Sequence, residues 1–315
     1  DFLGHKYCAV ACLNCAAGYL YAENLPSRHF AYRDLSIKTN GSTDLPMLAA
    51  YIHILALLPL TAQILRQEPR RDIWLYGSIF LAAIGTMVLL GVTGEEVQSR
   101  GFAAALHWSE LTVIVIFGGL VICKGPQQVW RLAGYIGGYL LLFAVLAAVF
   151  SVLLYRHEPA NVHGPALYSG WLWAHIGSSL VTYALVTLAA IAAMAYVVQE
   201  HALKHRKPTR WSRRLPPLRD SEYMLVGFLK WSAWVLVIGI VSGFALRYVE
   251  GSPIWSIDHK MLLTLLGFAT ICTLIFIHEK STLRGKMAVR FVLGAWLLLT
   301  LAFPGVRFVT GYIVG

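Results

Sequence analysis

Five of the eleven histidines lie within long apolar segments or at their ends, where an ionisable side chain is costly and therefore suggests a function. At about 1.5 Å per helical residue, His175 would lie about 6 Å, and His53 about 13 Å, below the same side of the bundle. His107 and His259 would lie near that side too, whereas His278 would lie at the inner end of its helix. A helix bundle holds a haem or metal ion with imidazoles from facing helices in this way. The alternative for each histidine is a helix cap or a hydrogen bond to a carbonyl.

A short polar segment, WSIDHK at 255–260, precedes one of these helices. Trp255 is amphipathic and suits the membrane interface. Asp258 directly precedes His259 and could either orient that imidazole or cap the following helix. Composition alone favours the second possibility, an interfacial tryptophan followed by a helix cap.

The elements that must position these side chains are membrane helices. Of the 315 residues, 57% are hydrophobic and 13% are charged, with a mean hydropathy of +0.62, whereas soluble domains carry roughly 25% charged residues. This composition excludes a soluble enzyme, a disordered protein and a nucleic-acid-binding domain, and continuous apolar runs exclude an outer-membrane barrel. We predict an all-α, polytopic membrane protein with eight core transmembrane helices, at about 44–65, 72–92, 105–123, 130–155, 171–198, 223–247, 259–278 and 289–312.

Residues 1–43 are predicted to be an extension of the membrane domain 44–315. Its apolar stretch 5–22 could be an extra transmembrane helix or could lie against the bundle. His5, Cys8, Cys12 and Cys15 share one helical stripe there, which could bind zinc or copper. The neighbouring alanines and a glycine favour packing against the bundle or against another subunit instead.

Loop charge predicts the orientation. Sixteen lysines and arginines lie in four loops on one side, seven of them in 199–222, which reads as a connector with helical extensions. Positive loops stay in the cytoplasm. We therefore expect a multi-pass protein of the bacterial inner membrane with its C-terminus outside.

Several segments of the second half of the chain form a further pattern. They are WLWAHIGSSLVTY at 171–183, LPPL at 215–218, WSIDHK at 255–260, LRGKMAVR at 283–290 and FPGVRFV at 303–309. Together they resemble the cytochrome c assembly family of the CcsA and CcmC type, and within it most closely the YpjD-like inner-membrane branch. The resemblance is best over 165–315 and extends more weakly, by helix count, to about 44–164.

The resemblance implies a membrane domain that binds haem, here of b type, near the outer membrane face. His175 matches the family's outer-face haem histidine, and Trp255 and Asp258 match part of its tryptophan-rich haem-contact motif. His278 matches a histidine that contributes to transmembrane haem in larger members. Their second outer histidine would fall near 311–312 and is absent, so that His259 or His107 would replace it. For the haem iron, His175 and His259 are the favoured pair, and His53 is a further candidate by position alone.

The function predicted from these features is to hold or present haem near the outer face, without turnover of a small molecule. Besides haem and the lipid bilayer, the partners would be apocytochrome c or other membrane subunits, and no nucleic acid. One alternative is a b-type haem or accessory subunit of a larger respiratory or membrane complex. Another is a non-haem scaffold or transporter, since fold does not fix function.

Overall fold

The computed structural model describes residues 44–66, 70–92, 102–123, 128–154, 170–206, 209–249, 259–280 and 286–305, and all of them are helical or lie in short turns between helices. The predicted extension 1–43, with its stretch 5–22, lies outside the described residues. So do Trp255 and Asp258. The boundary between extension and membrane domain therefore stays a prediction.

The described part of the chain is all-α, as the composition predicts. Its helices are α2 (Asp44–Ala62), α3 (Ile73–Val92), α5 (Phe102–Ile122), α6 (Ala133–Leu154), α7 (Gly170–Lys204), α8 (Arg210–Arg214), α9 (Leu218–Val249), α10 (His259–Lys280) and α11 (Lys286–Thr300). Short turns η1 (Gln63–Leu65) and η2 (Val129–Leu132) adjoin α2 and α6, and a π-helical turn η3 (Leu301–Gly305) follows α11.

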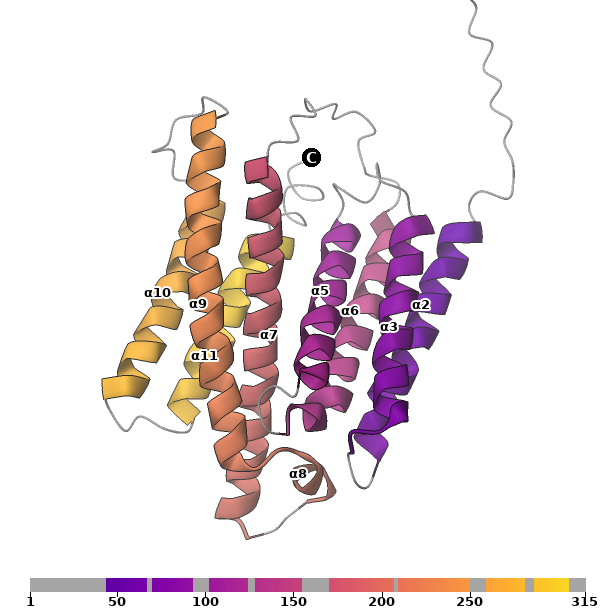
Figure 1. Ribbon diagram of the computed structural model, residues 1–315, viewed down its shortest axis with the longest axis vertical. Coiled ribbons are helices and arrows are strands. Elements are labelled where there is room, and N and C mark those ends of the chain that lie inside the picture. The colour runs from indigo at the N-terminus through magenta and orange to yellow at the C-terminus, as the bar shows by residue number, and fades with distance from the viewer. Residues whose placement is uncertain are drawn as a thin grey trace, which may run out of the picture. The chain divides into compact units, whose positions relative to one another are not determined.

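Seven of the described helices are long and apolar enough to cross a membrane, and α11 is a shorter apolar helix at the place of the predicted eighth. Consecutive long helices run in opposite directions, so α2, α5, α7 and α10 all begin on the side opposite α8 (Figure 1). The predicted helical extensions of 199–222 are present, because α7 continues to Lys204 and α9 begins at Leu218.

The central helix is α7, which packs against α9 along most of its length and also against α5 and α11 (Figure 1). Its buried face is rich in alanine, including Ala184, Ala189 and Ala193. Small side chains let helix backbones approach closely, and this is a main source of helix association in a membrane. Polar contacts add to this packing: the Tyr139 hydroxyl of α6 lies 3.2 Å from that of Tyr183 of α7.

A close backbone contact joins α2 to α6. A methyl group placed on Gly137 would lie 2.6 Å from the backbone nitrogen of Thr61, and one on Gly134 would meet the backbone of Ile64. Only glycine fits at these two positions. The contact places α2, which carries His53, firmly against the rest of the bundle.

Side-chain hydrogen bonds stabilise the side of the bundle that carries α8. The Gln199 side-chain nitrogen lies 2.7, 3.2 and 3.0 Å from the carbonyl oxygens of Ser212, Leu215 and Pro216. Arg66 donates to both carboxylate oxygens of Asp72, at 3.0 and 2.7 Å. These hydrogen bonds hold the pKa of Asp72 below its usual value. The bonds from Gln199 therefore hold the connector 199–222 against the end of α7. The Arg66–Asp72 pair joins the residue after η1 to the residue before α3.

Candidate functional site

The predicted histidines separate into three places. His175 lies near the first end of α7, and His278 lies near the last end of α10, on the opposite side of the bundle. His53 and His107 meet each other between α2 and α5. His259 is the first residue of α10, and its side chain lies outside the description.

The imidazole of His175 is oriented by α9. Its Nδ1 lies 2.9 Å from the backbone oxygen of Gly239 and 3.5 Å from the hydroxyl of Ser242. A carbonyl oxygen only accepts, so Nδ1 carries the hydrogen and donates it. In the neutral ring, the other nitrogen, Nε2, then keeps a lone pair, which is the state of a histidine that ligates a metal through Nε2.

Glycine in α9 makes room for this ring. A methyl group on Gly243 would lie 3.0 Å from Cε1 and 3.2 Å from Nδ1 of His175. Because α7 and α9 run antiparallel, the first turns of α7 face the last turns of α9 (Figure 1). The Ser242-Gly243 pair therefore forms a cradle for an imidazole at this end of the bundle.

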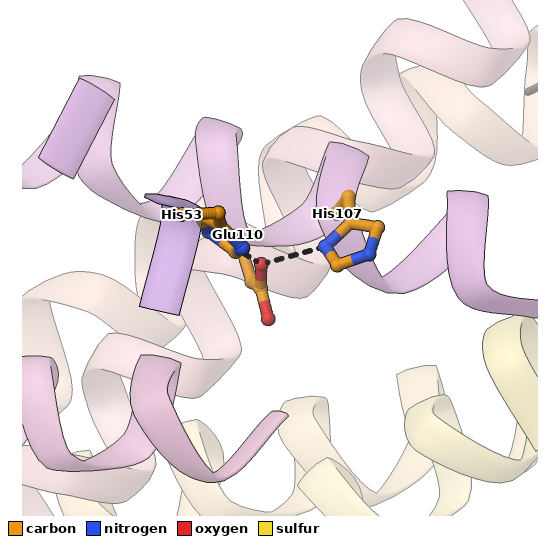
Figure 2. Close-up of side chains that lie close together, drawn as sticks. All are labelled: His53, His107 and Glu110. Carbon is orange, nitrogen blue, oxygen red and sulfur yellow. Dashed lines mark hydrogen bonds and ion pairs between the residues drawn. The ribbon is translucent and has the colours of Figure 1, made fainter. Parts of the chain in front are cut away.

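A second arrangement consists of His53, His107 and Glu110. Figure 2 shows both imidazoles directed at the carboxylate. One carboxylate oxygen, Oε2, lies 3.4 Å from Nε2 of His53 and 3.1 Å from Nδ1 of His107. The side chains of His53 and Glu110 are each 1% exposed, and that of His107 is 12% exposed.

Helix geometry explains why these residues meet. His53 is nine residues from the start of α2 and Glu110 is eight from the start of α5, so both lie about 12–13 Å from the same side. His107 precedes Glu110 by three residues, which places the two side chains on one face of α5. Glu110 was missed in the sequence, although an acidic residue inside an apolar helix was itself a signal.

The site retains unused hydrogen-bonding capacity. Nε2 of His53 and Oε1 of Glu110 are both buried without a hydrogen-bond partner. Buried polar atoms in native proteins are seldom left in this state. Two imidazole nitrogens and a carboxylate oxygen converge here, and all three lie within 4.8 Å of one another.

His278 occupies a different environment. It lines a hollow of about 10 Å³ with Tyr196, Glu222 and residues of α9 and α11. Such a volume holds about one water molecule. This hollow is therefore too small to hold a haem.

For haem, the donor chemistry of His175 fits, since a neutral imidazole that donates from Nδ1 has the lone pair on Nε2 that haem iron takes from a histidine. The side chain of its favoured partner, His259, lies outside the description. Trp255 and Asp258 belong to the segment between α9 and α10, whose two helix ends lie on the same side as His175. The predicted pairing of His175 with His259 thus stays a prediction.

Comparison with known proteins identifies a matching family and several relatives. Residues 45–313 match the family described as "Cytochrome C assembly protein". The chain is 36% identical over 247 residues to "Uncharacterized 28.8 kDa protein in nifR3-like 5'region" of Azospirillum brasilense, a match that covers 78% of this chain and 88% of that protein.

Two further relatives are similar over shorter stretches. "Inner membrane protein YpjD" of Escherichia coli (strain K12) is 26% identical over 206 residues, which is 65% of this chain and 73% of that protein. "Cytochrome c biogenesis protein CcsA" of Chlamydomonas reinhardtii is 28% identical over 123 residues, which is 38% of this chain and 32% of that protein. No solved structure matches the chain.

Proposed function

Because the chain belongs to the cytochrome c assembly protein family, as the match over 45–313 shows, we propose that it binds haem near the outer membrane face with His175 as an iron ligand. The family is associated with haem handling, and the predicted resemblance of the chain to this family is confirmed by the match. The protein is a multi-pass membrane protein, because seven of its described helices are long and apolar enough to cross a membrane.

The observation that carries this proposal is the hydrogen bond from Nδ1 of His175 to the Gly239 carbonyl, 2.9 Å long. It fixes the tautomer and the direction of the ring before any ligand is bound, and it makes Nε2 a better electron donor. The hydroxyl of Ser242 donates a second hydrogen bond to the same carbonyl oxygen of Gly239, at 2.9 Å. Bound haem would supply an iron centre in a flat, largely apolar ring.

The remaining parts of the proposed site come from the segment that joins α9 to α10. Trp255 would contact the apolar face of the ring, and Asp258 would orient the imidazole of His259, the proposed second ligand. Both flanking helix ends lie on the side where α7 begins. The role that follows is to hold or present haem at that side, for partners such as apocytochrome c or another membrane subunit.

The proposed orientation places this side outside the cytoplasm. The basic connector with α8 lies at the opposite side, where Lys204, Arg210 and Arg213 are exposed. Positive loops are retained in the cytoplasm, and YpjD is named an inner membrane protein. We place this chain in the bacterial inner membrane, with its C-terminus outside.

Haem content of a His175→Ala variant tests the proposal. The wild-type protein, purified from haem-sufficient cells, should show a Soret band and a pyridine haemochrome. The variant should bind haem at least about tenfold more weakly, because orienting groups around a metal ligand alone contribute that much. Gel filtration and far-ultraviolet circular dichroism would check that it is folded.

His205→Ala is the matched control, since His205 is exposed on the opposite side of the bundle. It should leave both the Soret band and the haem content unchanged. A His175→Ala protein with the spectrum and haem content of the wild type would remove His175 from the site. Wild-type protein without haem would overturn the proposal itself.

A further inference from the structure

We propose that His53, His107 and Glu110 bind a divalent first-row transition-metal ion, separate from haem. Two imidazole nitrogens and a carboxylate oxygen form a ligand set that zinc and ferrous iron share, and the ligand class disfavours calcium and magnesium. The three ligand atoms already lie within 4.8 Å of one another, and both imidazoles face the carboxylate (Figure 2). This proposal does not depend on haem binding at His175.

The spacing of the ligand atoms matches the size of such an ion. Zinc binds nitrogen and oxygen at roughly 2.0–2.1 Å, so two ligands at the corners of a tetrahedron lie about 3.3–3.4 Å apart. The observed separations from Oε2 of Glu110 are 3.4 Å to His53 and 3.1 Å to His107. The two nitrogens lie within 4.8 Å of each other, so small side-chain movements complete the geometry.

Burial gives the physical reason for a cation. An ionised carboxylate 1% exposed inside a membrane bundle needs a positive partner, since desolvation of a lone charge is costly. The carboxylate contacts two imidazoles, which are neutral in their metal-binding form, and its Oε1 has no hydrogen-bond partner. A divalent ion would use the lone pairs of both imidazoles and neutralise the carboxylate, with a fourth position left for water.

A porphyrin suits this place less well than a single ion. A carboxylate oxygen of Glu110 lies between the two imidazoles, where an iron with both as axial ligands would have to sit. The ring would also have to displace the side chains that bury His53 and Glu110. An ion needs neither change, and it can enter past His107, whose side chain is the most exposed of the three.

The bound ion would connect two helices. The neighbours of α2 are chiefly α3 and α6, and those of α5 are α3, α6 and α7. Bonds from His53 and from Glu110 to one ion would link α2 to α5 directly, near the middle of both helices. The ion would thus stabilise the half of the bundle formed by α2, α3, α5 and α6.

Cobalt titration of the full chain is the test. Wild-type protein in detergent, treated with a chelator, should bind one Co²⁺ per chain, show the visible absorption of a low-coordinate cobalt site, and release Co²⁺ to Zn²⁺. Glu110→Gln, which keeps the side-chain shape, should weaken Co²⁺ binding about 100-fold. This is roughly the fold-change expected when one of four ligands is lost from a structural metal site. His205→Ala, on the opposite side of the bundle, should titrate like the wild type.

A second variant gives a signal that loss of folding cannot produce. Nδ1 is the ring nitrogen of His107 nearer the backbone, so the sulfur of His107→Cys comes close to its position. In a chain without its native cysteines, Co²⁺ bound to that variant should acquire a thiolate-to-cobalt charge-transfer band, which the same chain with His107 intact lacks. Absence of stoichiometric Co²⁺ binding by the wild type would overturn the proposal, as would binding that Glu110→Gln leaves unchanged or a His107→Cys complex without the band.

Discussion

Replacing Gly137 by alanine should force α2 and α6 apart. The added methyl carbon would lie 2.6 Å from the nitrogen of Thr61, 2.7 Å from the carbonyl carbon of Leu60 and 2.8 Å from Cα of Thr61. Heavy atoms in contact prefer about 3.5–4.0 Å. The two helices must therefore separate by about 1 Å, because a backbone cannot rotate out of the way as a flexible side chain can.

The neighbouring glycine supplies the matched control. A methyl group on Gly138 would meet nothing within 4 Å. Both substitutions gain helix propensity, up to about 1 kcal/mol each, so this gain cancels when the two variants are compared. The difference between them isolates the cost of overpacking, which is about 1–3 kcal/mol. Because the added methyl group would meet three backbone atoms, we expect an overpacking cost in the upper half of that range.

Unfolding in detergent, followed by circular dichroism while a denaturing detergent is added, measures this difference. Gly138→Ala should unfold at the wild-type midpoint or slightly beyond it, and Gly137→Ala should unfold clearly earlier. If both variants unfold at the same midpoint, α2 and α6 do not approach each other as described. The reasoning about their contact would then be refuted.

Two other predictions concern the proposed haem site and the orientation. Gly243→Ala should push the His175 ring by a few tenths of an ångström, since the methyl group would lie 3.0 Å from Cε1, and should shift the Soret band. Gly227→Ala, with nothing within 4 Å, should not shift it, and identical spectra for both would contradict the cradle. A cysteine at exposed Leu203, in a chain without its native cysteines, should resist an impermeant maleimide until the cells are permeabilised. Labelling of intact cells would reverse the proposed orientation.

Most helix positions were predictable because each apolar run must be long enough to cross the bilayer. The predicted segments 72–92 and 259–278 agree with α3 and α10 within two residues at either end. The last helix is less regular than the prediction of 289–312 implies. Its α-helical part ends at Thr300 and a π-helical turn containing Pro304 follows, because proline cannot donate the next helical hydrogen bond.

The candidate site was predictable in its residue types and less so in its partners. His53, His107 and His175 were conspicuous because each is ionisable within an apolar run. Their contacts depend on which helices become neighbours, and nothing local in the sequence encodes that. The Gly239 carbonyl belongs to the backbone and leaves no trace in a side-chain pattern.

The lengths of α7 and α9 determine what approaching molecules meet first. With 35 and 32 residues, they are about 52 and 48 Å long, whereas the hydrocarbon core of a bilayer is about 30 Å thick and its headgroup layers add only about 5–8 Å on each side. The pair is therefore longer than the whole bilayer is thick, and on the side of α8 Gln199 holds the connector against the end of α7. A molecule that approaches the side of the bundle carrying α8 would meet the exposed basic residues of the connector, Lys204, Arg210 and Arg213 among them.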